Sequence, residues 1–271
     1  MNKLRFFVVF LIALCVQLSY SQNKMTAQAA EKAAFLAKAP PRVQEYYRVF
    51  DSLAVTPQDK PAYQKWSVGE LKKYASLVYD ANDYDPVMKE KINRLKVNTQ
   101  TKVNENRTDD YDVVREVRNR ISDKYAEVII NPYWLTIVVD GIASVPYIDG
   151  IMKLTKINIQ AKITKVWKGT NVKAGDVLTC YYLTFWGYRG FVQGGTYVVA
   201  LFPLLGDNNS DVAYALGGPG EVQKSVYPIE NNYIIDEDNL FKLGNKVELR
   251  TFTNALSTTI GQIMNWRESA Q

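Results

Sequence analysis

The chain of 271 residues contains no histidine and only two cysteines, Cys15 and Cys180. Without histidine, neither a Ser-His-Asp triad nor a Cys-His catalytic pair can be built. An ordinary zinc site is excluded as well, because such sites use histidine together with several cysteines. Paired carboxylates can still catalyse hydrolysis, as they do in glycosidases. The missing histidine therefore removes most classes of hydrolytic enzyme, but not all of them.

The first 21 residues have the pattern of a secretory signal peptide. Lys3 and Arg5 precede an apolar run over residues 6–16, and a Ser-Tyr-Ser triplet then places small residues before a cleavage point at Gln22. The apolar run is shorter than the roughly 20 residues that span a bilayer. We expect no transmembrane segment after cleavage, and a secreted or periplasmic protein.

Cys15 raises the alternative of a lipid anchor. Lipidation favours a small residue before the cysteine, and Leu14 is not small, so cleavage by signal peptidase is the preferred prediction. Cys180 is then the only thiol, which excludes disulfides within the chain. Because it lies in an apolar, strand-like run, we expect a small buried side chain there rather than a reactive or bridging thiol.

The charge of the chain is weak and mixed in sign. Lys and Arg number 33 against 28 Asp and Glu, and loss of Lys3 and Arg5 lowers the net charge from +5 to +3. Nucleic-acid binding requires a concentrated basic face, so we expect no nucleic-acid partner. Without disulfides, the chain has to be held together by its hydrophobic core, as one large domain or two small ones.

Residues 22–128 show the periodicity of helices. Five helices are expected: 26–39, 42–54, one beginning at the capping box Ser67-Val68-Gly69-Glu70, one beginning at Asp85-Pro86, and one from Thr108-Asp109-Asp110 to Val128. The last three begin with side chains that accept from free backbone N–H groups, or with proline at the first helical position.

From about residue 133 the pattern changes to the alternation of strands. Strands are predicted at 134–145, 157–167, 177–185, 196–202 and 212–216, more weakly at 222–227 and 233–235, with a helix at 254–266. Several short strands between turns are typical of a small barrel or sandwich. The predicted class is α+β: a signal peptide (1–21), a helical region (22–128), and a β-barrel with a C-terminal helix (129–271).

Three stretches of the second half share one pattern of strands and turns: 163–169, a strand ending in a Lys-Gly turn; 174–178, where the next strand begins; and 194–202, a glycine turn followed by a strand. Through them, residues 133–265 resemble the OB-like barrels of the netrin and tissue-inhibitor-of-metalloproteinases superfamily, and related barrels of bacterial secreted proteins. The resemblance implies an OB-like barrel, an architecture often used for binding.

The chain departs from the inhibitors of that superfamily in two respects. In those inhibitors the barrel begins the mature protein, and an N-terminal cysteine chelates the zinc of the target. Here the mature N-terminus is Gln22, far before the barrel, and the disulfides of the family are absent. We therefore do not expect this chain to inhibit proteases.

The densest aromatic cluster lies at residues 181–191. It contains Tyr181, Tyr182, Phe185, Trp186, Tyr188, Arg189 and Phe191. Alternation along the strand sends about half of its side chains to the outer face. Trp186, Tyr188, Arg189 and Phe191 lie in a glycine-flanked turn, where exposed rings beside an arginine are suited to stacking on sugars or peptide side chains. These four are the candidate ligand-binding residues; the alternative is that the aromatic rings belong to the core and to turn packing.

Three acidic clusters are candidates for metal binding or catalysis: Asp80-Asp83-Asp85, Asp109-Asp110-Asp112 and Asp236-Glu237-Asp238. Each lacks the glycine of a calcium loop. The first two coincide with helix starts, where acids are expected in any case. We therefore expect no metal and no cofactor, and assign no catalytic residue.

These observations favour a non-catalytic binding protein of the cell envelope, whose partner is a protein or a glycan and whose contact surface is the aromatic turn. A second candidate surface is the helical region, if Tyr46, Tyr47, Tyr74 and Tyr79 do not all fit one core. Two alternatives of other classes stay open: a histidine-free hydrolase with paired carboxylates, and a structural envelope component without a discrete site.

Overall fold

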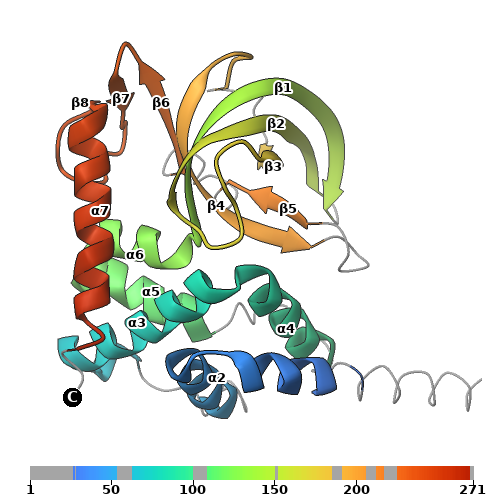
Figure 1. The fold of residues 1–271 in the computed structure, drawn as a ribbon, viewed down its shortest axis with the longest axis vertical. Helices are drawn as coiled ribbons and strands as arrows, with labels where there is room; N and C mark the ends of the chain where they lie inside the picture. The colour runs from blue at the N-terminus through green and yellow to red at the C-terminus, as the bar shows by residue number, and fades with distance from the viewer. Residues whose placement is uncertain are drawn as a thin grey trace, which may run out of the picture.

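The computed structural model describes residues 27, 29–53, 63–99, 109–149, 152–184, 191–205, 212–216 and 225–268. Helices come first, an eight-stranded sheet follows, and a long helix ends the described chain (Figure 1). The predicted α+β class, with N-terminal helices, strands and a C-terminal helix, is confirmed. The predicted signal peptide and Cys15 lie outside the described residues.

The helical layer below the sheet is formed by α2 (Pro41–Leu53), η1 (Tyr63–Lys65), α3 (Val68–Tyr84), α4 (Pro86–Thr99), α5 (Asp109–Arg120) and α6 (Asp123–Ile130). The predicted capping box begins α3: the Glu70 N–H donates to Ser67 Oγ at 3.1 Å, and the Ser67 N–H donates to Glu70 Oε2 at 2.7 Å. Asp85 Oδ1 accepts from the Met88 N–H at 2.9 Å and so caps α4. Of the helices that are described, none is long and apolar enough to cross a membrane.

The prediction of a single fifth helix ending at Val128 is wrong. Two helices, α5 and α6, occupy this stretch, and Ser122 between them is extended, with φ −176° and ψ 151°. The N–H groups of Ile121 and Ser122 both donate to the Val117 carbonyl, which closes α5. Both helices bury their apolar stripe in the same core, so the apolar spacing continues across the break and hides it.

The sheet contains β1 (Tyr133–Asp149), β2 (Met152–Lys168), β3 (Val177–Thr184), β4 (Thr196–Leu205), β5 (Val212–Ala215), β6 (Val226–Glu230), β7 (Tyr233–Ile235) and β8 (Lys246–Glu248). Their order is β1-β2-β3-β5-β4-β6-β7-β8, and β1 also pairs with β4. The pairing of β3 with β5 is parallel. β8 was not predicted, because its three residues include only one apolar side chain, Val247.

The sheet buries a different hydrophobic cluster on each face. On one face, Leu135, Ile137 and Cys180 belong to a cluster made only of residues from the strands and their loops, which we call the inner core. On the other face, Trp134 and Tyr227 join the side chains of the helices in the junction core. Alternation along β1 explains why neighbours Trp134 and Leu135 enter different cores.

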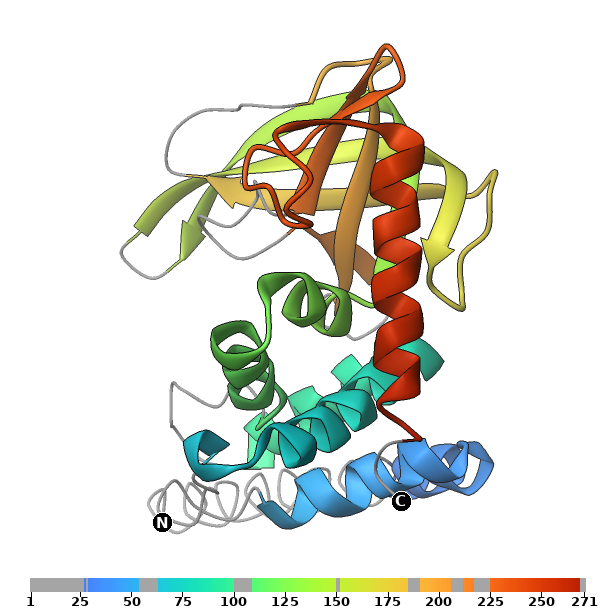
Figure 2. The ribbon, with the colours of Figure 1, turned by 90° about the vertical axis from the view of Figure 1, so that its left-hand side faces the viewer.

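Helix α7 (Leu249–Asn265) runs beside the molecule from the sheet to the helical layer (Figure 2). Its buried residues Phe252, Leu256 and Ile263 belong to the junction core along its whole length. The helix begins five residues before the predicted start at residue 254. It therefore fastens the two layers to each other.

The prediction for Cys180 is confirmed. Its thiol is free, fully buried and part of the inner core. Burial raises the pKa of Cys180 to about 12, so the reactive thiolate is disfavoured.

Gly169, directly after β2, is required by the close approach of β1. Its φ is +136°, and a Cβ there would lie 2.6 Å from Cδ1 of the fully buried Tyr133. We predict that Gly169→Ala lowers the free energy of unfolding by about 2–3 kcal/mol, measured by urea denaturation.

Gly261→Ala in α7 is the matched control, since a Cβ there meets nothing within 4 Å. It is expected to leave stability unchanged or to raise it by up to about 1 kcal/mol, the helix propensity gained. Equal urea midpoints for the two variants would contradict the packing described for Gly169.

Candidate functional site

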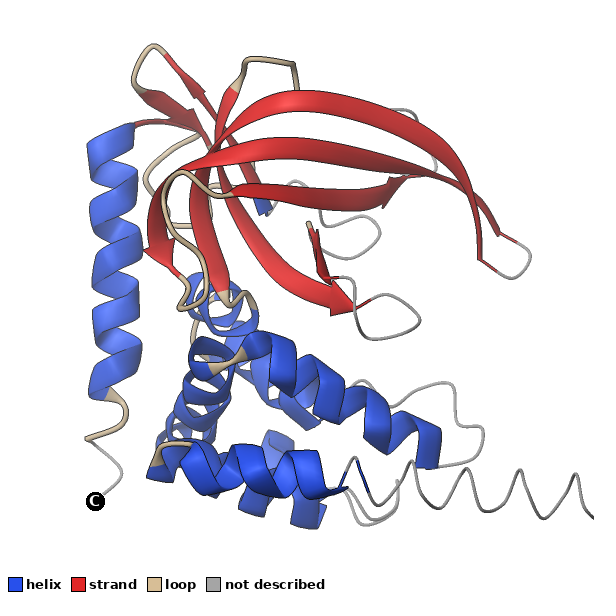
Figure 3. Ribbon diagram, turned by 45° about the vertical axis from the view of Figure 1, so that its right-hand side comes forward, coloured by secondary structure: helices blue, strands red, loops and turns tan. Residues whose placement is uncertain are grey.

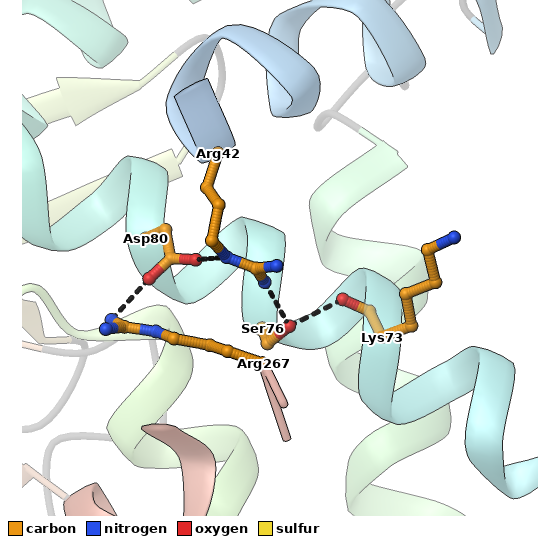
Figure 4. A network of polar contacts seen from close by, with 5 residues as sticks. All are labelled: Arg42, Lys73, Ser76, Asp80 and Arg267. Carbon is orange, nitrogen blue, oxygen red and sulfur yellow. Dashed lines mark hydrogen bonds and ion pairs between the residues drawn. The ribbon is translucent and has the colours of Figure 1, made fainter. Parts of the chain in front are cut away.

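Asp80 of α3 lies where α2, α3 and the segment after α7 meet (Figure 4). Its Oδ2 accepts from Nε of Arg42 at 2.6 Å, and its Oδ1 forms an ion pair with Nη2 of Arg267. Arg42 Nη2 also donates to Ser76 Oγ at 2.7 Å, and that hydroxyl donates to the Lys73 carbonyl at 2.7 Å. One buried carboxylate thereby holds three segments of the chain together.

Both oxygens of Asp80 are engaged, so this acid is not free for proton transfer. Burial raises its pKa, while the hydrogen bond from Arg42 and the charges of both arginines oppose the rise. A hydrolase with paired carboxylates needs two acids that face a substrate. The arrangement at Asp80 instead fits a structural ion pair.

Lys168, at the end of β2, crosses from the sheet to the helices. Its Nζ donates to the carbonyls of Val128 at 2.7 Å and Asn131 at 3.0 Å. These carbonyls lie at the C-terminal end of α6, where carbonyl groups lack partners within the helix. The Nζ also lies 4.3 Å from the ring centroid of Tyr79 in α3. Lys168 is only 5% exposed, so this contact is inside the protein.

A second polar link lies beside the first. Asn82 of α3 donates through Nδ2 to the Ile129 carbonyl at 2.8 Å and accepts through Oδ1 from Lys89 Nζ at 2.7 Å. Thr170, after β2, donates to the Asp83 carbonyl at 2.8 Å. The helical layer and the sheet are therefore joined by the buried hydrogen bonds of Lys168 and the exposed one of Thr170, as well as by the junction core.

The four predicted binding residues divide into two groups. Trp186, Tyr188 and Arg189 lie outside the described residues. Phe191 is 1% exposed and belongs to the inner core, with its ring centroid 4.6 Å from that of Tyr197. Its side chain therefore packs inside the sheet rather than facing a ligand.

The preceding strand alternates as expected. Tyr182 belongs to the inner core. Its neighbour Tyr181 is half-buried, and Lys156 Nζ lies 4.0 Å from the Tyr181 ring centroid. Because neighbours along a strand point to opposite faces, Tyr181 lies on the outer face of the sheet.

The second candidate surface, the helical tyrosines, is largely absent. Tyr46, Tyr47 and Tyr79 are each at most 2% exposed and belong to the junction core. Tyr74 is half-buried and stacks on Trp66, with ring centroids 4.3 Å apart. The first three therefore fit one core, because one face of the sheet enlarges the core of the helices.

The acidic cluster at residues 236–238 does not present calcium ligands. Asp236 is buried, and the Asn239 N–H donates to its backbone carbonyl at 3.0 Å. Burial raises the pKa of Asp236, and the backbone N–H groups of Leu240, Phe241 and Asn239 oppose that rise. Calcium needs converging oxygens, not N–H donors. Within the described ranges, no three His, Cys, Asp or Glu residues converge as metal ligands.

The outer half of β1 is a feature that sequence reasoning missed. β1 pairs with β2 out to Asp149, but its pairing with β4 ends at Val138. The β1–β2 register shifts between Val139 and Gly141, and beyond this point no described strand lies along the other edge of β1. Figure 3 shows this end of the hairpin projecting from the sheet.

Every side chain from residue 142 to 148 is exposed, and residues 141–148 carry no charge. Ile142, Val145, Tyr147 and Ile148 are the large apolar side chains of this run, and Ile148, at 72%, is the most exposed one that the structure describes. We call residues 141–149 the free edge. Natural proteins rarely leave such an edge uncovered, and contiguous exposed apolar groups mark interaction sites. The available signal was an uncharged strand with apolar residues on both faces.

The chain was compared with known proteins in three ways. No protein-family model, no curated protein and no solved structure matches it. The resemblance to the netrin superfamily stays a prediction, and the function has to be argued from the geometry above.

We predict that Asp80→Ala lowers the free energy of unfolding by about 2–4 kcal/mol, because it leaves two partly buried arginines without their anion. Arg115→Ala is the control: its ion pair with Asp112 is a surface contact, and the expected change is below about 0.5 kcal/mol. Chemical denaturation measures both, and a change at Asp80 as small as that at Arg115 would refute the structural role.

Proposed function

We propose that this protein is a secreted or periplasmic binding protein, without catalytic activity, that uses the free edge to contact a protein of the cell envelope. The observation that carries the proposal is the run of seven exposed, uncharged residues at 142–148. Burying large apolar side chains of this kind is worth about 1.5–3 kcal/mol each, which is enough for a few of them to sustain specific binding.

A protein partner fits the free edge better than a glycan. Three of its four large apolar side chains are aliphatic, namely Ile142, Val145 and Ile148, whereas sugar stacking uses aromatic faces. An unpaired strand edge also offers backbone donors and acceptors to an added strand. Pro146, within this stretch, has no backbone N–H to donate, so side-chain contacts are expected to contribute more than strand pairing.

The finer architecture is part of the proposal. The pairings run β1-β2-β3-β5-β4 and return to β1, which supports an OB-like barrel of five strands. In that architecture the β1–β2 hairpin extends beyond the ring of strands. The aromatic turn stays a predicted second contact through Trp186, Tyr188 and Arg189, while Phe191 contributes to the core.

The test is a pull-down from envelope extract with the wild type and a Val145→Ser, Ile148→Ser double variant. Val177→Ser is the matched control, because Val177 is a 60% exposed valine on the same sheet, away from the free edge. The wild type and the control are expected to capture the same partner. The double variant is expected to capture at least tenfold less of it, because the two lost apolar contacts together contribute more than about 1.4 kcal/mol to binding.

Two further measurements separate the outcomes. A Trp186→Ala, Tyr188→Ala variant assigns any remaining binding to the aromatic turn. Size-exclusion chromatography with light scattering measures the oligomeric state. A dimer is the expected result if the free edge binds a second copy of this chain rather than another protein. Identical partner sets for the wild type and the Val145→Ser, Ile148→Ser variant would overturn the proposal.

A further inference from the structure

Lys168 is a buried amine whose hydrogen-bond and ring contacts, within the described residues, include no carboxylate. Among the described residues it contacts the Val128 and Asn131 carbonyls and the ring of Tyr79. An ammonium taken out of water costs several kcal/mol unless an opposite charge compensates it. Carbonyl dipoles at the end of α6 compensate this charge only in part.

The charged groups around Lys168 act on its ammonium in both directions. From α3, Asp80 and Asp83 favour the ammonium, whereas Lys89 from α4 and Arg267 from the C-terminal segment disfavour it. Asp80 is already bound by both Arg42 and Arg267. When Lys168 is charged, this junction holds two carboxylates, Asp80 and Asp83, and four cations: Lys168, Lys89, Arg42 and Arg267.

On α6 itself, the carboxylate of Glu127 does not pair with Lys168. It is bound to Arg118 and accepts from Asn131 Nδ2. The element that receives the Lys168 hydrogen bonds therefore brings no free negative charge to them.

We propose that Lys168 is a proton-dependent latch between the sheet and the helical layer, and that the latch is tightest when the amine is neutral. A neutral amine has two N–H groups, and the structure gives Nζ two carbonyl acceptors. Loss of the proton therefore keeps both hydrogen bonds to α6. Only the contact between the Lys168 cation and the Tyr79 ring is lost. Arg267 lies 5.4 Å from the same ring and supplies a second cation contact.

Burial is the largest effect, and it lowers the pKa of Lys168 to about 7 from the ordinary value of 10.5. Below pH 7 the folded and the unfolded protein both carry the proton, so the contribution of Lys168 to stability is at its lowest and no longer changes with pH. Between pH 7 and 10.5 the unfolded chain binds more protons than the folded one, so stability rises with pH. Acidification across this range therefore loosens the latch.

The test compares the wild type with Lys168→Met at pH 6, 7, 8 and 9, using urea unfolding and hydrogen exchange of the amides at the end of α6. Relative to the variant, the unfolding equilibrium constant of the wild type is expected to fall about tenfold or more between pH 7 and 9. Lys162→Met, which removes an exposed lysine of the same strand, is expected to keep the pH dependence of the wild type.

A titration of the lysine side chains by carbon NMR measures the proton directly and needs only the wild-type protein. One lysine signal is expected to titrate near neutral pH and to be absent from Lys168→Met. If every lysine titrates above pH 9, the latch is disproved, whether or not the variant folds. The same conclusion follows if Lys168→Met and the wild type show equal pH dependence of unfolding.

Discussion

The structure depends on the burial of one face of the sheet against the helices. Trp134 of β1 is fully buried at this contact, stacked on Tyr227 with ring centroids 5.9 Å apart. Leaving such a face in water would expose several large apolar side chains, and the helical layer alone is too small to bury its own. Each layer completes the core of the other, which explains how a chain without disulfides stays folded. Asp80 and Lys168 then fix the orientation of the layers with polar contacts that hydrophobic packing alone does not specify.

The same packing explains why the hairpin is the candidate contact surface. β1 is buried on one face as far as Val139, which is 1% exposed, and on the other as far as Thr136, and it then leaves the body of the sheet. From Ile142 to Ile148 its side chains are uncharged, mostly apolar and exposed, so they add nothing to the core of this chain. Exposed apolar residues of this kind are the basis of the proposed contact with a partner. The buried inner half of the strand positions the outer half for that proposed contact.

The sequence predicted the parts of the fold that follow from local rules. The capping box at Ser67 and the alternation of inward and outward side chains along β3 are fixed by neighbouring residues. The break at Ser122 and the burial of Phe191 depend on which distant residues share a core, and a single sequence does not contain that information. The free edge was missed for the same reason: residues 141–149 look like any apolar strand until the end of the β1–β4 pairing is known.

The central claim is that the helical layer and the sheet form one cooperative unit. Native-state hydrogen exchange in increasing urea tests it most directly, by comparing α3 and α6 with β4 and residues 133–138 of β1. The account predicts that the most protected amides of all four elements open with the same free energy and the same dependence on urea. Helices that open in a separate step, at a lower free energy than the strands, would contradict it.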